Sequence, residues 1–390
     1  MRIMHVITRF ILGGAQENTL YTVEGQHRAG HQVMLVTGPP LGPEGELLDR
    51  AVRSGARVVV LSHLRRAVNP WHDSAAFLQL CAVMRDFRPD VVHTHSSKAG
   101  ILGRLAARFV RVPVIVHTVH GLPFHPYQNP LVNWAYILGE RTCARYTDRI
   151  LCVADAMTRQ ALAAHIGRRA QYTTVYSGLE VETFLAQFDR AEARRKFGLG
   201  ERDLVVGKVA RLSDLKGHSF LLRAFEEVAY KQPHARLLLV GDGWRRKEYE
   251  ERVRRMGLSD RVIFAGLIPP DEVPAAIHAM DVLVHTSLRE GLARVLPQAL
   301  ISGVPVISYD VDGAREVVIN GKTGFLLKPM DVDGLSATIL KLLNDAHLRE
   351  RLGRAGRERF TPVFDHKRMV EKITAVYEQC LGERRAVRSR

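Results

Sequence analysis

Short apolar segments alternate with longer segments of helical pattern along almost the whole chain, and the alternation occurs in two series. The apolar segments of the first series span residues 2–7, 32–37, 57–61, 91–93, 114–118, 149–153 and 173–176. Those of the second series span residues 204–210, 235–240, 262–264, 282–285, 304–309 and 324–327. Regular strand–helix alternation is typical of parallel sheets covered by helices on both faces. The sequence therefore predicts two doubly wound α/β domains, with a boundary near residues 178–200.

Length and composition agree with a two-domain protein. A chain of 390 residues with 46% hydrophobic and 25% charged residues is typical of globular proteins and too long for one ordinary domain. The first residues are interrupted by Arg2 and Arg9, so we expect a first strand there and not a signal peptide. The four cysteines are scattered without a CxxC pair, which favours a reducing compartment, the cytoplasm, and argues against structural zinc.

The formal net charge of +15 restricts the classes of partner. Basic proteins bind nucleic acids, anionic membrane surfaces or anionic metabolites. Lys and Arg are spread along this chain, few aromatic residues lie among them, and no nucleic-acid-binding motif is evident. We therefore expect no nucleic-acid partner. Solvated helix faces explain most of the charge, and attraction to the anionic inner face of a membrane is the main alternative.

Residues 281–306, DVLVHTSLREGLARVLPQALISGVPV, carry the clearest functional signal. An apolar strand is followed by a loop containing Glu290, a short helix and a second apolar strand. Amide groups at the start of a helix lack intrahelical partners and bind anions. A carboxylate beside such a site would repel a simple phosphate, but it suits a ligand that also carries hydroxyl groups. The segment therefore predicts a site for a sugar nucleotide.

Three further loops of the second series follow predicted strands. Arg211 and Lys216 follow the first strand, and together they could neutralise a pyrophosphate; the alternative is two surface charges. Gly241-Asp242-Gly243 has the composition of a tight turn. Gly266-Leu267-Ile268 could offer backbone groups and an apolar floor to a nucleobase.

The first series offers weaker candidates. Gly13 and Gly14 would let the backbone approach a ligand closely, or they form a plain strand–helix turn. His120 follows a strand and could make a polar contact in a cleft, or it is a histidine satisfied by the backbone. His93 and His95 form an HxH pair, but no third ligand at suitable spacing supports a metal site, so we expect none.

Together these motifs resemble family-4 retaining glycosyltransferases of the GT-B fold. The resemblance extends over about residues 1–380, in the family's order, and rests on these motifs: Gly13-Gly14, His120-Gly121, Arg211 with Lys216-Gly217, Gly241-Asp242-Gly243, Phe264-Ala265-Gly266, Glu290-Gly291, Gln298-Ala299 and Gly303-Val304-Pro305-Val306. It implies two Rossmann-like domains facing a central cleft. Residues 1–185 would bind the acceptor and residues 186–362 the nucleotide-sugar donor. Residues 363–390 would form a helix that crosses back to the first domain, followed by a basic tail.

The resemblance also implies roles for individual residues. Arg211 and Lys216 match the pair that binds the donor pyrophosphate, Glu290 matches a glutamate that contacts the transferred sugar, and His120 would position that sugar. These four are the expected catalytic residues. The expected donor-binding residues are Gly14, Gly241, Leu267, Ile268, Gly291, Leu292, Ala293, Arg294, Val295 and Gln298.

Three positions depart from the family pattern. Gln298 stands where a second glutamate usually binds the ribose hydroxyls, and its amide could still accept from one hydroxyl and donate to another. Leu292 and Ala293 replace the usual Phe-Gly. If Ala293 caps the helix, Pro297 lies in the first turn, where a missing N–H group costs little.

The implied activity is retaining, metal-independent transfer from a nucleotide sugar, with a UDP-sugar favoured, to a glycan or lipid-linked acceptor in surface polysaccharide biosynthesis. No further cofactor is implied. Charge on the departing diphosphate would be stabilised by Arg211, Lys216 and the helix N-terminus. Asp310-Val311-Asp312 comes closest to a metal-binding DxD motif. No nucleophile is evident in the first domain, which favours front-face transfer. A GT-B nucleotide-sugar epimerase and a non-catalytic basic scaffold remain alternatives; an NAD-linked enzyme is disfavoured because no GxGxxG follows a strand.

Overall fold

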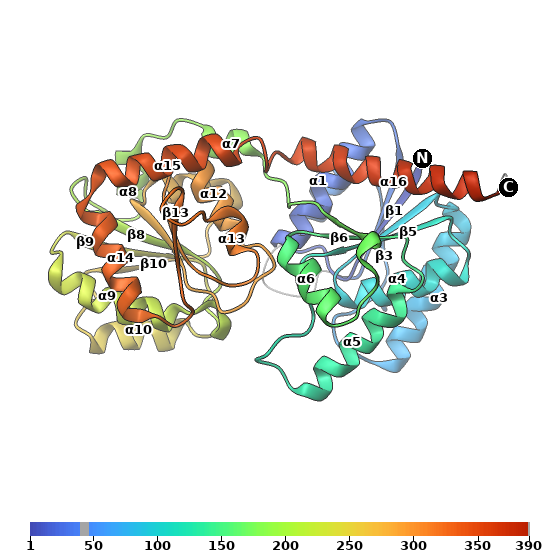
Figure 1. Ribbon diagram of the computed structural model, residues 1–390, viewed down its shortest axis with the longest axis horizontal. Coiled ribbons are helices and arrows are strands. Elements are labelled where there is room, and N and C mark those ends of the chain that lie inside the picture. Colours follow the sequence, from blue (N-terminus) through green and yellow to red (C-terminus); the bar gives the residue numbers. More distant parts are fainter. Residues whose placement is uncertain (40–46, 389–390) are drawn as a thin grey trace. The chain divides into compact units, whose positions relative to one another are not determined.

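The computed structural model describes residues 1–39 and 47–388 and divides into two compact units (Figure 1). The first unit contains Met1–Leu179 and Asp365–Arg390, and the second contains Glu180–Phe364. The division precedes the expected boundary after residue 185, because the short helix α7 (Val181–Leu185) packs on α12 (Val295–Ile301) of the second unit. The last helix, α16 (His366–Arg388), belongs to the first unit, where it packs on α1 (Gly14–Arg28).

The first unit contains a seven-stranded parallel sheet with the strand order β3-β2-β1-β4-β5-β6-β7. Its strands are β1 (Arg2–Ile7), β2 (Gln32–Thr37), β3 (Arg57–Val60), β4 (Val91–His95), β5 (Val114–Val119), β6 (Arg149–Cys152) and β7 (Tyr172–Thr174). Its further helices are α2 (Leu48–Arg53), α3 (Pro70–Phe87), α4 (Ser97–Phe109), α5 (Pro130–Ala144), α6 (Asp155–Ala163) and the 3₁₀ turn η1 (Arg169–Gln171).

Alternating residues of the strands build separate cores on the two faces of this sheet, as the two-residue period of a strand requires. Met4 and Val6 face a core that includes residues of α3 and α4. Ile3 faces a core that includes Ile373 and Tyr377 of α16. Since side chains two positions apart share a face, His5 lies on the α16-covered side of β1.

The second unit contains a six-stranded parallel sheet with the order β10-β9-β8-β11-β12-β13. Its strands are β8 (Leu204–Val209), β9 (Ala235–Val240), β10 (Val262–Gly266), β11 (Val282–His285), β12 (Val306–Tyr309) and β13 (Gly324–Leu327). Its further helices are α8 (Arg190–Lys196), α9 (His218–Lys231), α10 (Arg246–Arg255), α11 (Val273–His278), α13 (Ala314–Val317), α14 (Val332–Asn344) and α15 (Ala346–Phe360), with 3₁₀ turns η2 (Asp214–Lys216) and η3 (Pro270–Glu272). Apolar residues of β8, β9, β11 and β12 share one core with α9 and α14.

The predicted fold class of two doubly wound α/β domains is confirmed. One local expectation is corrected: α12 begins at Val295 with Arg294 as its N-cap, so Ala293 lies one residue before the cap. Pro297 still falls in the first turn, where its missing N–H group breaks no helical hydrogen bond. Among the described residues, no helix is both long and apolar enough to cross a membrane.

Candidate active site

The second unit brings Lys216 and Glu290 together at its topological switch point. The strand order runs in opposite directions on either side of the β8–β11 pair, and open α/β sheets bind ligands beyond the carboxyl ends of strands at such a point. Lys216 ends η2, which follows β8, and Glu290 lies in the loop after β11. The Nζ of Lys216 donates a hydrogen bond to Oε1 of Glu290.

Backbone contacts hold the Glu290 loop to both neighbouring loops. The Glu290 amide donates to Oδ2 of Asp312 at 2.6 Å, and the Gly313 amide donates to the Gly291 carbonyl at 3.1 Å. On the other side, the Leu288 amide donates to the Leu215 carbonyl at 2.9 Å. Asp312 adopts a left-handed backbone with φ of 47°, an unfavourable conformation for a residue with a side chain. The loop that carries Glu290 is thus held by the loops that follow β8 and β12.

The electrostatic environment keeps Glu290 ionised. Burial alone would raise the pKa of its carboxyl group, but the Lys216 ammonium and the neighbouring His285 ring outweigh burial and hold the pKa well below its ordinary value. The Nε2 atom of His285 lies 3.4 Å from Oε1 of Glu290. An ionised Glu290 carboxylate can accept hydrogen bonds but cannot act as a general acid near neutral pH.

A second lysine lies close to Lys216 and Glu290. It was not identified as a site residue from the sequence. Lys208 of β8 is fully buried, and its Nζ donates to Oγ1 of Thr286 at 3.0 Å. Burial and the nearby Lys216 charge lower the pKa of Lys208 to about 7, with Glu290 opposing them. The signal was present in the sequence, because a lysine inside a strand of a parallel sheet covered on both faces must be buried.

Backbone hydrogen bonds also join the loops that follow β8, β9 and β10. The Leu212 amide donates to the Asp242 carbonyl at 3.0 Å, and the Gly241 amide donates to the Gly266 carbonyl at 2.8 Å. Gly241 has φ of 126°, and a Cβ atom there would lie 2.3 Å from the Ala210 carbonyl oxygen. The predicted site residues Arg211, Gly241, Leu267 and Ile268 therefore lie on adjoining loops, with the side chains of Arg211 and Leu267 exposed.

The segment after Glu290 is only partly available to a ligand. The side chains of Leu292 and Val295 are buried in the unit, so these two expected donor-binding residues could contact a donor only through their backbone. Gly291, Ala293, Arg294 and Gln298 are half-buried.

The predicted site residues of the first unit are Gly14, which begins α1, and His120, which follows β5. This sheet reverses its order between β1 and β4. The loops that follow these two strands are joined by a hydrogen bond of 2.9 Å between the hydroxyl groups of Thr8 and Ser96. Nδ1 of His95 lies 3.1 Å from Nε2 of His120.

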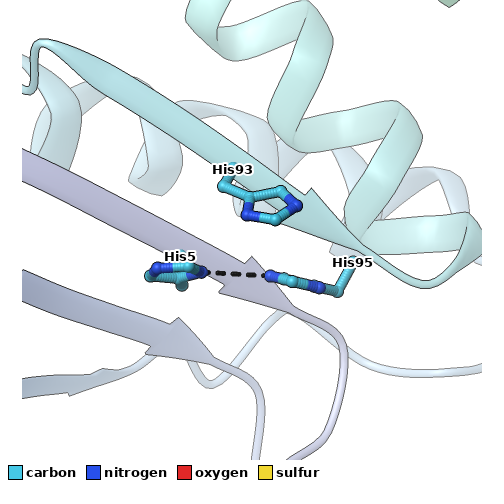
Figure 2. Close-up of side chains that lie close together, drawn as sticks. All are labelled: His5, His93 and His95. Atoms are coloured by element: carbon cyan, nitrogen blue, oxygen red, sulfur yellow. Dashed lines mark hydrogen bonds between the residues drawn. The ribbon is translucent and has the colours of Figure 1, made fainter. Parts of the chain in front are cut away.

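The expectation that the HxH pair lacks a third imidazole was wrong. His5 of β1 pairs in register with His93 of β4, and the ring nitrogens of His5, His93 and His95 that could bind one ion lie within 4.8 Å of one another (Figure 2). Spacing along the sequence could not indicate this, because β1 and β4 become neighbours only in the sheet. The three side chains are fully buried.

Comparisons with known proteins agree with this arrangement. Residues 13–178 match the model of the glycosyl transferase 4-like domain, and residues 189–359 match that of the glycosyl transferases group 1. The chain is 31% identical over 333 residues to the 2-deoxystreptamine glucosyltransferase of Streptomyces kanamyceticus, covering 80% of this chain and 83% of that protein. The chain belongs to the group 1 glycosyltransferases. The predicted family and the predicted enzyme class are confirmed.

Other similarities cover nearly the whole glycosyltransferase. It is 26% identical over 381 residues to the UDP-Gal:α-D-GlcNAc-diphosphoundecaprenol α-1,3-galactosyltransferase of Escherichia coli, covering 97% of this chain and 96% of that protein. The crystal structure of Anabaena HepE in complex with UDP has the same fold, with a TM-score of 0.84 at 21% identity, covering 97% of this chain and 100% of that one.

Proposed function

We propose that this glycosyltransferase moves a sugar, with retention of anomeric configuration, from a UDP-sugar to a glycan or lipid-linked acceptor in polysaccharide assembly. The contact between Lys216 and Glu290 at the β8–β11 switch point carries the proposal. Names of relatives support the substrate classes: one uses UDP-Gal and a diphosphoundecaprenol-linked acceptor, and crystal structures of Anabaena HepE contain UDP or UDP-glucose.

Each charged residue has a distinct role in this proposal. Lys216 and Arg211 bind the donor pyrophosphate and stabilise the negative charge that develops on it as the glycosidic bond breaks. Glu290 accepts hydrogen bonds from the transferred sugar, consistent with its stable ionisation. The pyrophosphate would compete with Glu290 for Lys216, so donor binding would release the carboxylate toward the sugar.

The other expected residues surround these charges. Gly241, Leu267 and Ile268 lie beside Arg211 and would receive the nucleobase through backbone groups and apolar contacts. Gln298 would bind the ribose hydroxyls. In the first unit, Gly14 would approach the donor through its backbone, and His120 would position the sugar.

The surroundings of Asp310 and Asp312 favour transfer without a metal ion. The two oxygens of Asp310 accept hydrogen bonds from Arg315, and Asp312 accepts one from the Glu290 amide. The cations Arg211 and Lys216 would replace a metal at the diphosphate. In front-face transfer, the acceptor oxygen bonds to the anomeric carbon as the bond to the diphosphate breaks, and the leaving phosphate oxygen takes the acceptor proton.

A thermal-shift screen against a panel of nucleotide sugars, with UDP as reference, tests the donor site. We expect UDP to raise the melting temperature of the wild type and to have little effect on Lys216→Ala. Lys231→Ala is the matched control, because Lys231 also pairs with a glutamate in this unit but lies on an exposed helix surface. A full UDP response in Lys216→Ala would contradict the site. Release of UDP in equal amounts with glycosylated acceptor would exclude epimerase activity.

We further propose that the protein works in the cytoplasm at the inner face of a membrane, through α5 of the first unit. Leu131, Trp134 and Leu138 are exposed at helical spacing on α5, and Arg141 and Arg145 continue the same face. An apolar stripe that continues into basic residues fits the interface of an anionic bilayer. The wild type should sediment with phosphatidylglycerol vesicles, whereas Trp134→Gln should stay in the supernatant. Equal sedimentation of both proteins would contradict the surface.

A further inference from the structure

A row of polar side chains crosses one buried face of the first sheet. His5 of β1 pairs with His93 of β4, and His95 of β4 pairs with Thr118 of β5. The two-residue period of a strand places these side chains, and His120 beyond the end of β5, on the side that α1 and α16 cover. Polar groups on a buried face must find partners within the protein, since leaving them unpaired costs free energy.

Hydrogen bonds connect this row to His120. Nε2 of His5 lies 2.8 Å from Oε1 of Gln26 on α1. Nδ1 of His5 lies 3.1 Å from Nε2 of His95, and Figure 2 draws this contact as a dashed line. The other ring nitrogen of His95, Nδ1, lies 3.1 Å from Nε2 of His120. Gln26 and three imidazoles thus form one continuous chain from α1 to the end of β5.

The C-terminal helix α16 supports both Gln26 and the remaining histidine. Nε2 of Gln26 donates to Oγ1 of Thr374 at 3.4 Å. His93 contacts the Tyr377 hydroxyl through Nδ1 and lies 2.6 Å from Oγ1 of Thr118 through Nε2. All six ring nitrogens of His5, His93 and His95 therefore have protein partners. A metal ion at this cluster would have to break several of these bonds, which favours a hydrogen-bond network over a metal site.

Burial fixes which ring nitrogen donates and which accepts in each hydrogen bond of this series. Burial lowers the pKa of His5 to about 4 and that of His95 well below its ordinary value, so both imidazoles are neutral near pH 7. A neutral imidazole has one N–H donor and one acceptor nitrogen. The Gln26 oxygen only accepts, so His5 donates from Nε2 and accepts at Nδ1. His95 must then donate from Nε2 and accept at Nδ1, where it receives the Nε2–H of His120.

We propose that Gln26, His5 and His95 are positioning residues that hold His120 in its Nε2–H tautomer. In this tautomer the Nδ1 atom of His120 carries the lone pair, so it can only accept a hydrogen bond from a sugar hydroxyl. The functional meaning of this tautomer rests on the proposed role of His120, whereas the chain itself can be tested without substrate. The Nδ1 atom of His120 would therefore discriminate between a sugar and its analogue with fluorine in place of that hydroxyl, because the analogue has no proton to donate.

Nitrogen-15 NMR of histidine-labelled full-length protein measures the tautomer directly. The His120 signals are assigned by their loss in His120→Ala. We expect Nε2–H for His120 in the wild type and a mixture of tautomers in Gln26→Met, which lacks an acceptor for His5. Gln26→Glu should restore the wild-type tautomer, because a carboxylate also accepts. His117→Asn is the control. His117 is a buried histidine on β5 that contacts Thr94 and takes no part in the hydrogen bonds from Gln26 to His120.

An Nδ1–H tautomer of His120 in the wild type, or an unchanged tautomer in both Gln26→Met and His95→Phe, would overturn the proposal. Melting temperatures separate loss of the tautomer from loss of the fold. Sugar transfer by His120→Ala is measured separately. Full transfer activity in that variant would refute the proposed role of His120 while leaving the NMR result for the chain intact.

Discussion

The Lys216 ammonium donates a hydrogen bond to the Glu290 carboxylate, although the two residues are 74 positions apart in sequence. One follows β8 and the other follows β11, and these strands are neighbours at the switch point of the sheet. A cation and an ionised carboxylate in contact provide both functions that a sugar diphosphate requires, a partner for phosphate oxygens and an acceptor for hydroxyl groups.

Gly217, directly after Lys216, should tolerate no side chain. Its φ is 68°, and a Cβ atom would lie 1.9 Å from the Thr286 carbonyl oxygen. Gly217→Ala should therefore destabilise the second unit and displace Lys216, with loss of UDP binding. Gly257→Ala is the matched control, because Gly257 has φ of 67° with open space around it. That variant should lose only about 1 kcal/mol from backbone strain and keep UDP binding. Equal unfolding free energies for the two variants would contradict this account.

Lys208→Met should increase stability most at low pH. The folded-state pKa of about 7 lies below the ordinary value of 10.5, so the unfolded chain binds the proton more tightly. The resulting penalty on folding is complete below about pH 7 and disappears as pH rises toward 10.5. We expect Lys208→Met to gain about 1–4 kcal/mol at pH 6 and less at pH 9, measured by urea unfolding. Lys322→Met is the control, because Lys322 is exposed, and its change in unfolding free energy should not depend on pH. If the gain in unfolding free energy of Lys208→Met is also independent of pH, burial of charge is not its cause.

Gln298→Glu should strengthen UDP binding. A carboxylate accepts stronger hydrogen bonds than an amide, so two ribose hydroxyls should gain roughly tenfold in affinity. Gln298→Ala should weaken binding in the same calorimetric titration. If both variants bind UDP as the wild type does, Gln298 has no contact with the nucleotide.

Glu140→Ala should destabilise the first unit strongly. Nη2 of the fully buried Arg104 donates to Oε2 of Glu140 at 2.7 Å. Removing the carboxylate leaves a buried, uncompensated guanidinium, which costs about 3–5 kcal/mol. Glu350→Ala, which breaks an exposed pair with Arg354, should leave the unfolding free energy nearly unchanged. Similar losses in both variants would contradict the importance of burial.

The sequence was sufficient to predict the strands of both sheets and the loops that follow them. Residues 235–240 and 282–285 are short apolar segments of β-forming residues, and each is a strand over its whole predicted length. Strand–helix alternation also predicted the doubly wound class, because parallel strands need helical crossovers.

Contacts between distant strands could not be predicted in the same way. His5 and His95 are 90 positions apart and meet because β1 and β4 pair at the centre of the sheet. The bond from the Glu290 amide to Asp312 likewise depends on a non-local contact between loops. Strand order decides these contacts, whereas local hydrophobic pattern decides only where each strand lies. Lys208 differs, because its burial could have been inferred from its strand.

The most direct test of the central claim is the rate of sugar transfer from a UDP-sugar by the wild type, Lys216→Ala and Glu290→Ala, all with melting temperatures close to one another. We expect kcat/KM to fall roughly 100-fold or more in each single variant. The double variant should lose less than the product of the two effects, because the residues are in contact. Transfer at the wild-type rate by either folded single variant would contradict the proposed site.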